Sequence, residues 1–205
     1  MPSLVLSVKQ KTLLSKFFIH LACLLPLVYT YNLAIADELG GDPVESIIHF
    51  TGIGAFNLLL LTLCVSPVSK WLKSTVLLNN RRLLGLYAFT YAVFHVLNFL
   101  FFEVQFDFSL FINEVFDRPY ITIGMVAILI LIPLAVTSVN LIRKRMGRKW
   151  QSLHNLSYLV VTLAAIHFYW SVKSEIIEPS IYIGLTIIVL ALRKRKLSRL
   201  IGIQK

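Results

Sequence analysis

The sequence predicts an all-α membrane protein, a polytopic bundle of six transmembrane helices with both termini in the cytoplasm. Hydrophobic residues make up 57% of the 205-residue chain and charged residues only 15%, whereas a soluble domain carries about a quarter charged residues. The apolar residues gather in six runs with helical lengths. The charged residues sort between alternate connections, as they do in multi-pass proteins.

The six spans are expected at residues 17–36, 46–69, 83–102, 119–142, 150–172 and 179–192. The first ends in Ala34-Ile35-Ala36, which has a small-residue cleavage pattern, but its apolar run is longer than that of a usual secretory signal. We therefore expect it to remain as a span. Pro133 is expected to kink the fourth span. The sixth is short for a bilayer and is expected to tilt or to be shielded by its neighbours.

Basic residues dominate the N-terminal segment, the connections between spans two and three and between four and five, and the C-terminal segment. Of the 20 lysines and arginines, only Arg118 and Lys173 fall on the opposite side, where all ten acids lie. The positive-inside rule then places both termini in the cytoplasm. Topology and contact with anionic lipid explain the net charge of +10, so no nucleic-acid partner is expected.

Two histidines stand at matching depth in different spans. His95 lies 13 residues after Arg82, and His167 lies 18 residues after Lys149, so both fall in the outer half of the membrane. Titratable side chains at this depth are costly and usually functional. We expect the two imidazoles to clamp one haem iron from both faces, which favours electron transfer because no coordination site stays open. The alternative is that they only form hydrogen bonds between helices.

His154 lies in the same span as His167, near its inner end and level with His20 of the first span. On a straight helix His154 and His167 would point about 140° apart, so one helix face cannot carry both without a bend. Cys23 and Cys64 lie in separate spans without CxxC spacing, which is typical of buried thiols. No internal repeat or glycine-rich nucleotide motif is evident.

Five stretches occur in an order and spacing that are specific when taken together. They are HLACLLPL from His20, DPVESIIHFTG from Asp42, RRLLGLYAFTYAVFH from Arg81, RPYITIG from Arg118 and LHNLSYLVVTLAAIHFYWSVK from Leu153. On these stretches the chain resembles the MsrQ (YedZ) family of haem-binding membrane subunits. That family belongs to the wider group of ferric-reductase-like transmembrane domains, and the resemblance covers nearly the whole chain, residues 1–205, as one such domain.

The resemblance implies haem b, with His95 and His167 as axial ligands and His154 in a second, auxiliary haem site. It implies quinol oxidation at the bacterial inner membrane, with flavin mononucleotide as a further candidate cofactor. It also implies delivery of electrons to MsrP, a periplasmic molybdenum-containing reductase that repairs methionine sulfoxide in oxidised proteins. The chain would then be the electron-transferring subunit of an oxidoreductase complex, with no substrate chemistry and no catalytic residue of its own.

The third span departs from the pattern of the wider reductase group, in which two spans present two histidines each. Here Arg81 stands about one haem spacing inward from His95, on nearly the same helix face. A second haem on His154 would therefore lack a histidine partner from this span, unless His20 fills the place.

Three arginines are candidate cofactor-binding residues. Arg81 or Arg82 is expected either to pair with a haem propionate or orient a quinone or flavin at the cytoplasmic face, or simply to anchor the topology. Arg118 is expected to bind a propionate of the outer haem, or else to pair with Asp117 or Glu114.

Two other functional classes fit part of the pattern. Intramembrane histidines also relay protons in haem-free, proton-coupled transporters, although here no acid lies inside a span and no paired broken helices are evident. The other class is a purely structural membrane anchor. For the electron carrier, we expect the acidic segment from Glu103 to Asp117 to dock the periplasmic partner.

Overall fold

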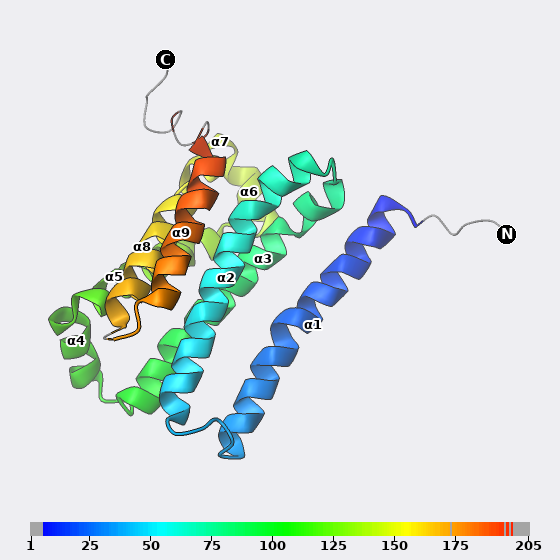
Figure 1. Ribbon diagram of the computed structural model, residues 1–205. Coiled ribbons are helices and arrows are strands. Elements are labelled where there is room, and N and C mark those ends of the chain that lie inside the picture. The colour runs from blue at the N-terminus through cyan, green and yellow to red at the C-terminus, as the bar shows by residue number, and fades with distance from the viewer. Residues whose placement is uncertain (1–5, 173, 195, 197, 199–205) are drawn as a thin grey trace. The chain divides into compact units, whose positions relative to one another are not determined.

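The computed structural model describes residues 6–172, 174–194, 196 and 198, and these residues form helices and short connections without a strand. The basic residues Lys173, Arg195, Arg199 and Lys205 of the predicted charge pattern lie outside the described residues. Contacts divide the chain into two compact units, Met1–Glu103 and Val104–Lys205 (Figure 1). The single domain over residues 1–205 stays a prediction.

Helices with the length and apolar character of membrane spans are present in both units. Four qualify within the described residues, namely Val8–Ile35, Pro43–Trp71, Thr75–Glu103 and Pro119–Val136, and a shorter apolar helix covers Ile177–Leu192. The predicted class of all-α, multi-pass membrane protein is confirmed at this level. The count of six spans and the cytoplasmic position of the termini stay predictions.

In the first unit, residues 6–103 form the long helices α1 (Val8–Ile35), α2 (Pro43–Trp71) and α3 (Thr75–Asn98), and α3 continues into a π-helical turn over Phe99–Glu103. Ser7 and Gln10 form a capping box at the start of α1. Asp42 caps α2, whose first residue is Pro43. These caps satisfy backbone N–H groups that have no partner inside the helix.

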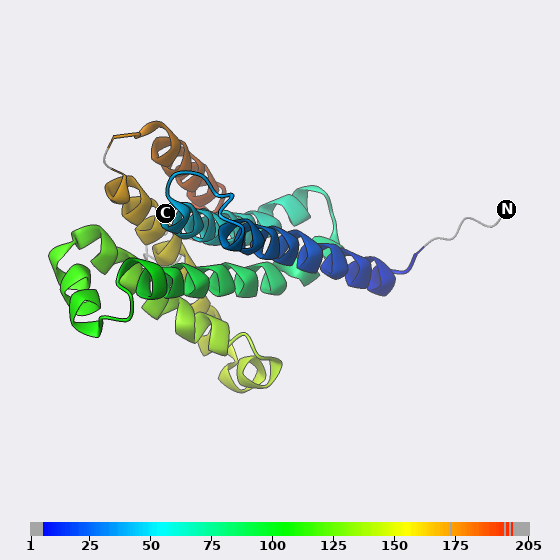
Figure 2. The same ribbon diagram turned by 90° about the horizontal axis from the view of Figure 1, so that it is seen from below.

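A row of polar contacts joins α1 to α3, which lie side by side (Figures 1 and 2). The Tyr91 hydroxyl donates to the carbonyl of Cys23 at 2.6 Å. His20 contacts the Tyr87 hydroxyl through Nδ1 at 2.5 Å. These partners are 68 and 67 residues apart, a nearly constant offset that two helices running in the same direction produce. The ring of His20 thus takes part in helix packing.

Asn98 joins all three helices of the first unit. It is only 2% exposed, its Oδ1 accepts from the Tyr31 hydroxyl of α1 at 2.6 Å, and its Nδ2 donates to Thr51 Oγ1 of α2 at 3.2 Å. Because the bilayer core supplies no water, these bonds satisfy polar groups that would otherwise be costly to bury.

We expect Asn98→Leu to lower the free energy of unfolding by about 1–2 kcal/mol, because it leaves the buried hydroxyl of Thr51 and the half-buried hydroxyl of Tyr31 without their amide partner. Thermal unfolding of the purified protein in detergent measures this change. Asn79→Leu is the matched control, since Asn79 is exposed and its contact with Thr12 is long, at 3.4 Å. Equal melting temperatures for the two variants would contradict the role given to Asn98.

The second unit is built on an antiparallel pair of helices, and Figure 2 gives a second view of it. Its described residues form the helices α4 (Phe108–Asp117), α5 (Pro119–Val136), α6 (Asn140–Met146), α7 (Arg148–His154), α8 (Ser157–Ser171) and α9 (Ile177–Leu192). α5 packs on α8, and α8 packs on α9. Gly147 separates α6 from α7 with φ 52° and ψ −123°, a combination that only glycine adopts readily.

The predicted fifth span, residues 150–172, is wrong as a single helix. One helix, α7, ends at His154, and the next helix, α8, begins at Ser157. The two histidines therefore belong to different helices, His154 to α7 and His167 to α8. At the break, the Ser157 hydroxyl donates to the carbonyl oxygen of His154 at 2.8 Å, and the N–H of Leu156 donates to the carbonyl of Leu153, three residues earlier, at 3.0 Å. Local side-chain and three-residue bonds replace the α-helical ones here.

The predicted fourth span, 119–142, is also shorter than expected. Helix α5 ends at Val136, three residues after Pro133. The Thr137 hydroxyl then donates to the carbonyl of Pro133 at 2.6 Å. The turn that follows leads into α6.

Helix α4 was not predicted. Its apolar residues recur at helical spacing, as Phe108, Phe111, Ile112, Val115 and Phe116, and Phe108 and Phe116 are 65% and 74% exposed. One apolar face beside polar positions is typical of a helix lying in a membrane interface.

Candidate histidine sites

His95 is held by helix α2 across the α2–α3 pair. Its Nδ1 lies 2.9 Å from the carbonyl oxygen of Ile48. One turn further along α2, Gly52 faces the ring, and a Cβ built on this glycine would lie 3.0 Å from both Cε1 and Nδ1. The imidazole is half-buried and therefore packs directly against the backbone of α2.

His167 is held in the same way by helix α5 across the α5–α8 pair. Its Nδ1 lies 2.6 Å from the carbonyl oxygen of Tyr120. One turn further along α5, Gly124 faces the ring, and a Cβ there would lie 2.8 Å from Nδ1 and 2.9 Å from Cε1. This imidazole is also half-buried.

The two arrangements share the same residue spacing. Each histidine follows its carbonyl partner by 47 residues, and in each case a glycine stands four residues after that partner. The stretches that supply these groups are IHFTG and YITIG. Neither a repeat nor either glycine was predicted from the sequence. A Gly and a His 43 residues apart occur in each unit, and this shared spacing is the signal that could have identified them.

A carbonyl oxygen can only accept a hydrogen bond, so Nδ1 carries the proton in each ring. In the neutral imidazole Nε2 is then the nitrogen with the lone pair, which is the form a metal ligand needs. Ligand histidines in proteins are commonly fixed this way by a backbone carbonyl. Each ring, with its own backbone partner, is therefore in the form that a haem-ligating histidine needs.

His154 has a different environment at the end of α7. Its ring stacks on Trp150 with centroids 3.9 Å apart, and its Nε2 lies 3.0 Å from Thr137 Oγ1. The Thr137 hydroxyl already donates to Pro133, so His154 Nε2 is the donor in this contact. The arrangement joins α7 to the end of α5, and it differs from the carbonyl-held pattern of the other two histidines.

The two arginines near the start of α3 are both half-buried. Arg81 donates from Nη1 to Ser66 Oγ of α2 at 3.3 Å, and Arg82 is the next residue of the helix. They stand at the opposite end of α3 from His95.

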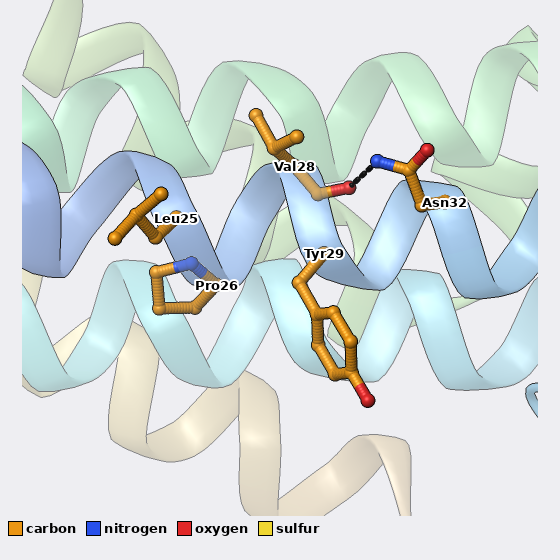
Figure 3. A pocket seen from close by; sticks show the side chains of 5 residues that line it. All are labelled: Leu25, Pro26, Val28, Tyr29 and Asn32. Carbon is orange, nitrogen blue, oxygen red and sulfur yellow. Dashed lines mark hydrogen bonds between the residues drawn. The ribbon is translucent and has the colours of Figure 1, made fainter.

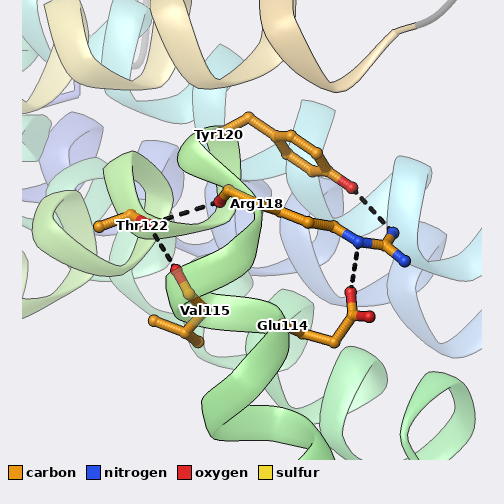
Figure 4. A network of polar contacts seen from close by, with 5 residues as sticks. All are labelled: Glu114, Val115, Arg118, Tyr120 and Thr122. Atoms are coloured by element: carbon orange, nitrogen blue, oxygen red, sulfur yellow. Dashed lines mark hydrogen bonds and ion pairs between the residues drawn. The ribbon is translucent and has the colours of Figure 1, made fainter.

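Arg118 lies where α4 meets α5, and Figure 4 shows its contacts. Its Nε pairs with Glu114 Oε2 at 2.6 Å, the alternative partner that the sequence left open. Its Nη1 also donates to the Tyr120 hydroxyl at 3.2 Å. The carbonyl of Tyr120 also accepts from His167. Tyr120 therefore contacts the ion pair through its hydroxyl and the histidine through its backbone.

An open pocket is lined by residues of helix α1 (Figure 3). Its volume is about 610 Å³, and it is lined by Leu25, Pro26, Val28, Tyr29 and Asn32. The only side-chain amide, that of Asn32, donates to the carbonyl of Val28 at 2.7 Å. The pocket contains none of the predicted site residues.

Residues 51–165 match the family described as ferric reductase like transmembrane component. The chain, with its apolar helices and two carbonyl-held histidines, is thus a ferric-reductase-like transmembrane protein. Relatives of one name occur in Salmonella newport (strain SL254), Salmonella paratyphi A (strain ATCC 9150 / SARB42) and Salmonella typhi. Each is a protein-methionine-sulfoxide reductase heme-binding subunit MsrQ, 42% identical over 192 residues that cover 93% of this chain and 96% of the relative. The chain belongs to this MsrQ family.

Proposed function

We propose that this chain is a haem b electron-transfer subunit in the bacterial inner membrane. It takes electrons from quinol and passes them to MsrP, a periplasmic molybdenum-containing reductase that repairs methionine sulfoxide in oxidised proteins. The family supports a redox role in a methionine sulfoxide reductase system. The quinol, the direction of transfer and the identity of the reductase belong to the proposal.

The observation that carries the proposal is the shared hydrogen-bonding of His95 and His167. Both rings donate Nδ1–H to a helix carbonyl, so both present Nε2 as the coordinating atom. We propose that they are axial ligands of haem b. When bound, haem b would supply a one-electron carrier, and His95 and His167 would hold it without leaving a position for oxygen.

The remaining predicted site residues have subsidiary roles in this proposal. His154 would bind a second haem through Nε2 only after giving up the contact of that nitrogen with Thr137. Arg81 and Arg82 supply positive charge for a propionate, a quinone or flavin mononucleotide at the cytoplasmic end of α3. Arg118 would offer a propionate its guanidinium beside the existing pair with Glu114.

The proposal is tested with the purified protein in liposomes. A quinol analogue should reduce its haem b, and purified MsrP with a methionine sulfoxide substrate should reoxidise it. Absorbance of the reduced haem follows both steps. A protein purified without haem, or one whose haem quinol does not reduce, would contradict the proposal. Solute uptake driven by a pH gradient in a haem-free protein would instead favour the transporter.

A further inference from the structure

We propose that Gly52 and Gly124 are positioning residues for the two haem-ligand histidines, in two copies of one helix-pair module. In each copy a helix carbonyl accepts a hydrogen bond from the imidazole Nδ1–H. The glycine four residues after that carbonyl lets the ring lie against the helix backbone. The inference rests on the proposed haem function and adds to it the residues that orient each ligand.

The two copies belong to different units of the chain and are independent observations. In the first, α2 supplies Ile48 and Gly52 to His95 of α3. In the second, α5 supplies Tyr120 and Gly124 to His167 of α8. The offset of 47 residues between carbonyl and histidine is the same in both. Packing alone would not require a carbonyl, a glycine and an imidazole to recur together at one spacing.

A side chain at either glycine would displace the ring. A Cβ at Gly124 would lie 2.8 Å from His167 Nδ1, and a Cβ at Gly52 would lie 3.0 Å from His95 Nδ1. These separations are shorter than ordinary van der Waals contacts between heavy atoms, so the imidazole must tilt or withdraw. At Gly124 the closest atom is the nitrogen that donates to the carbonyl, and at Gly52 that nitrogen and Cε1 are equally close. The hydrogen bond would therefore weaken in both cases.

That hydrogen bond determines two properties of the ligand. It fixes the tautomer, so that Nε2 carries the lone pair, and it raises the basicity of that nitrogen. A less basic ligand donates less charge to iron and stabilises the ferric state less. Loss of the bond should therefore weaken haem binding and raise the midpoint potential of the haem that remains.

The test compares Gly52→Ala and Gly124→Ala with three other glycine variants, all as full-length protein in detergent. Haem content, the low-spin electron paramagnetic resonance signal and the midpoint potential are measured for each. We expect the two variants to bind haem about tenfold more weakly, with an altered resonance signal and a raised potential. Gly124→Ala should show the larger change, because its overlap with the ring is closer.

Three glycines of the same helices or units serve as controls. A Cβ at Gly85 would meet Thr62 at an ordinary 3.5 Å, and one at Gly184 would meet no described atom within 4 Å. A Cβ at Gly54 would overlap the Tyr91 ring. Gly85→Ala and Gly184→Ala should match the unchanged protein. Gly54→Ala should lower the melting temperature, while the haem that it retains keeps the original resonance signal and potential.

The outcomes separate this inference from the function on which it rests. If the unchanged protein contains no haem, the proposed function fails. If it contains haem, and Gly52→Ala and Gly124→Ala match Gly85→Ala in signal and potential, the glycine inference alone is wrong. If neither variant accumulates as folded protein, or if both lose only stability as Gly54→Ala does, the glycines serve helix packing and the inference is likewise rejected.

Discussion

Replacing His95 or His167 with alanine should remove most of the haem b from the purified protein and abolish its reduction by quinol. Each substitution deletes an imidazole whose Nδ1 is fixed by a backbone carbonyl, and alanine offers iron no ligand atom. A pyridine–haem assay gives the haem content, and the visible spectrum gives the coordination state. Loss of either ligand should also stop electron delivery to the periplasmic reductase.

The other histidines provide the controls for this experiment. His49→Ala should leave the spectrum unchanged, because His49 is exposed near the start of α2. His154→Ala should retain the haem that is bound through His95 and His167. This substitution should lower the haem content of the protein only if a second haem is bound at His154. Haem content and spectrum that survive both His95→Ala and His167→Ala would overturn the ligand assignment.

Neutralising the four acids Glu103, Asp107, Glu114 and Asp117 should slow electron transfer to the periplasmic reductase about tenfold or more at low salt. Under the proposed topology these acids face the periplasm, and charge complementarity acts mainly on association rates. Amide replacements preserve size, and asparagine at position 107 retains the cap that Asp107 provides for α4. Stopped-flow reoxidation of the haem by the reductase measures the rate.

The matched control neutralises the other acidic connection, Asp37, Glu38, Asp42 and Glu45, all of them exposed. Both variants lose four charges, so a nonspecific effect of net charge would be the same in each. The deficit of the first variant should also shrink as salt is raised, since screening removes long-range attraction between exposed charges. Equal rates for the two variants at low salt would place the docking surface elsewhere.

The sequence was sufficient for the class of protein. Apolar runs and the sorting of basic and acidic connections predicted an all-helical membrane protein, because burial in lipid constrains composition over whole helices. The spans expected at 46–69 and 179–192 agree with Pro43–Trp71 and Ile177–Leu192 to within three residues. Those expected at 17–36 and 83–102 begin nine and eight residues after the observed helices. The amphipathic helix Phe108–Asp117 was missed, although its apolar spacing is visible in the sequence.

The break after His154 could not be predicted from the local sequence pattern. The stretch from Trp150 to Trp170 reads as one apolar helix, yet the structure divides it at Asn155 and Leu156. Helical pattern and length carry little information about a two-residue interruption, because it depends on competing hydrogen bonds such as that from Ser157 to His154. Likewise, the sequence offered two partners for Arg118, and the fold selected Glu114.

The amino-acid sequence by itself determined the membrane class, the family resemblance and the choice of His95 and His167 as the residues to examine. Only the tertiary structure decided what holds those two rings, namely the carbonyls of Ile48 and Tyr120 and the bare backbone at Gly52 and Gly124. The physical reason is that every residue has a carbonyl group. Which carbonyl meets an imidazole 47 residues later depends on how two helices pack, and the repeated spacing of glycine and histidine acquires that meaning only once the packing is known.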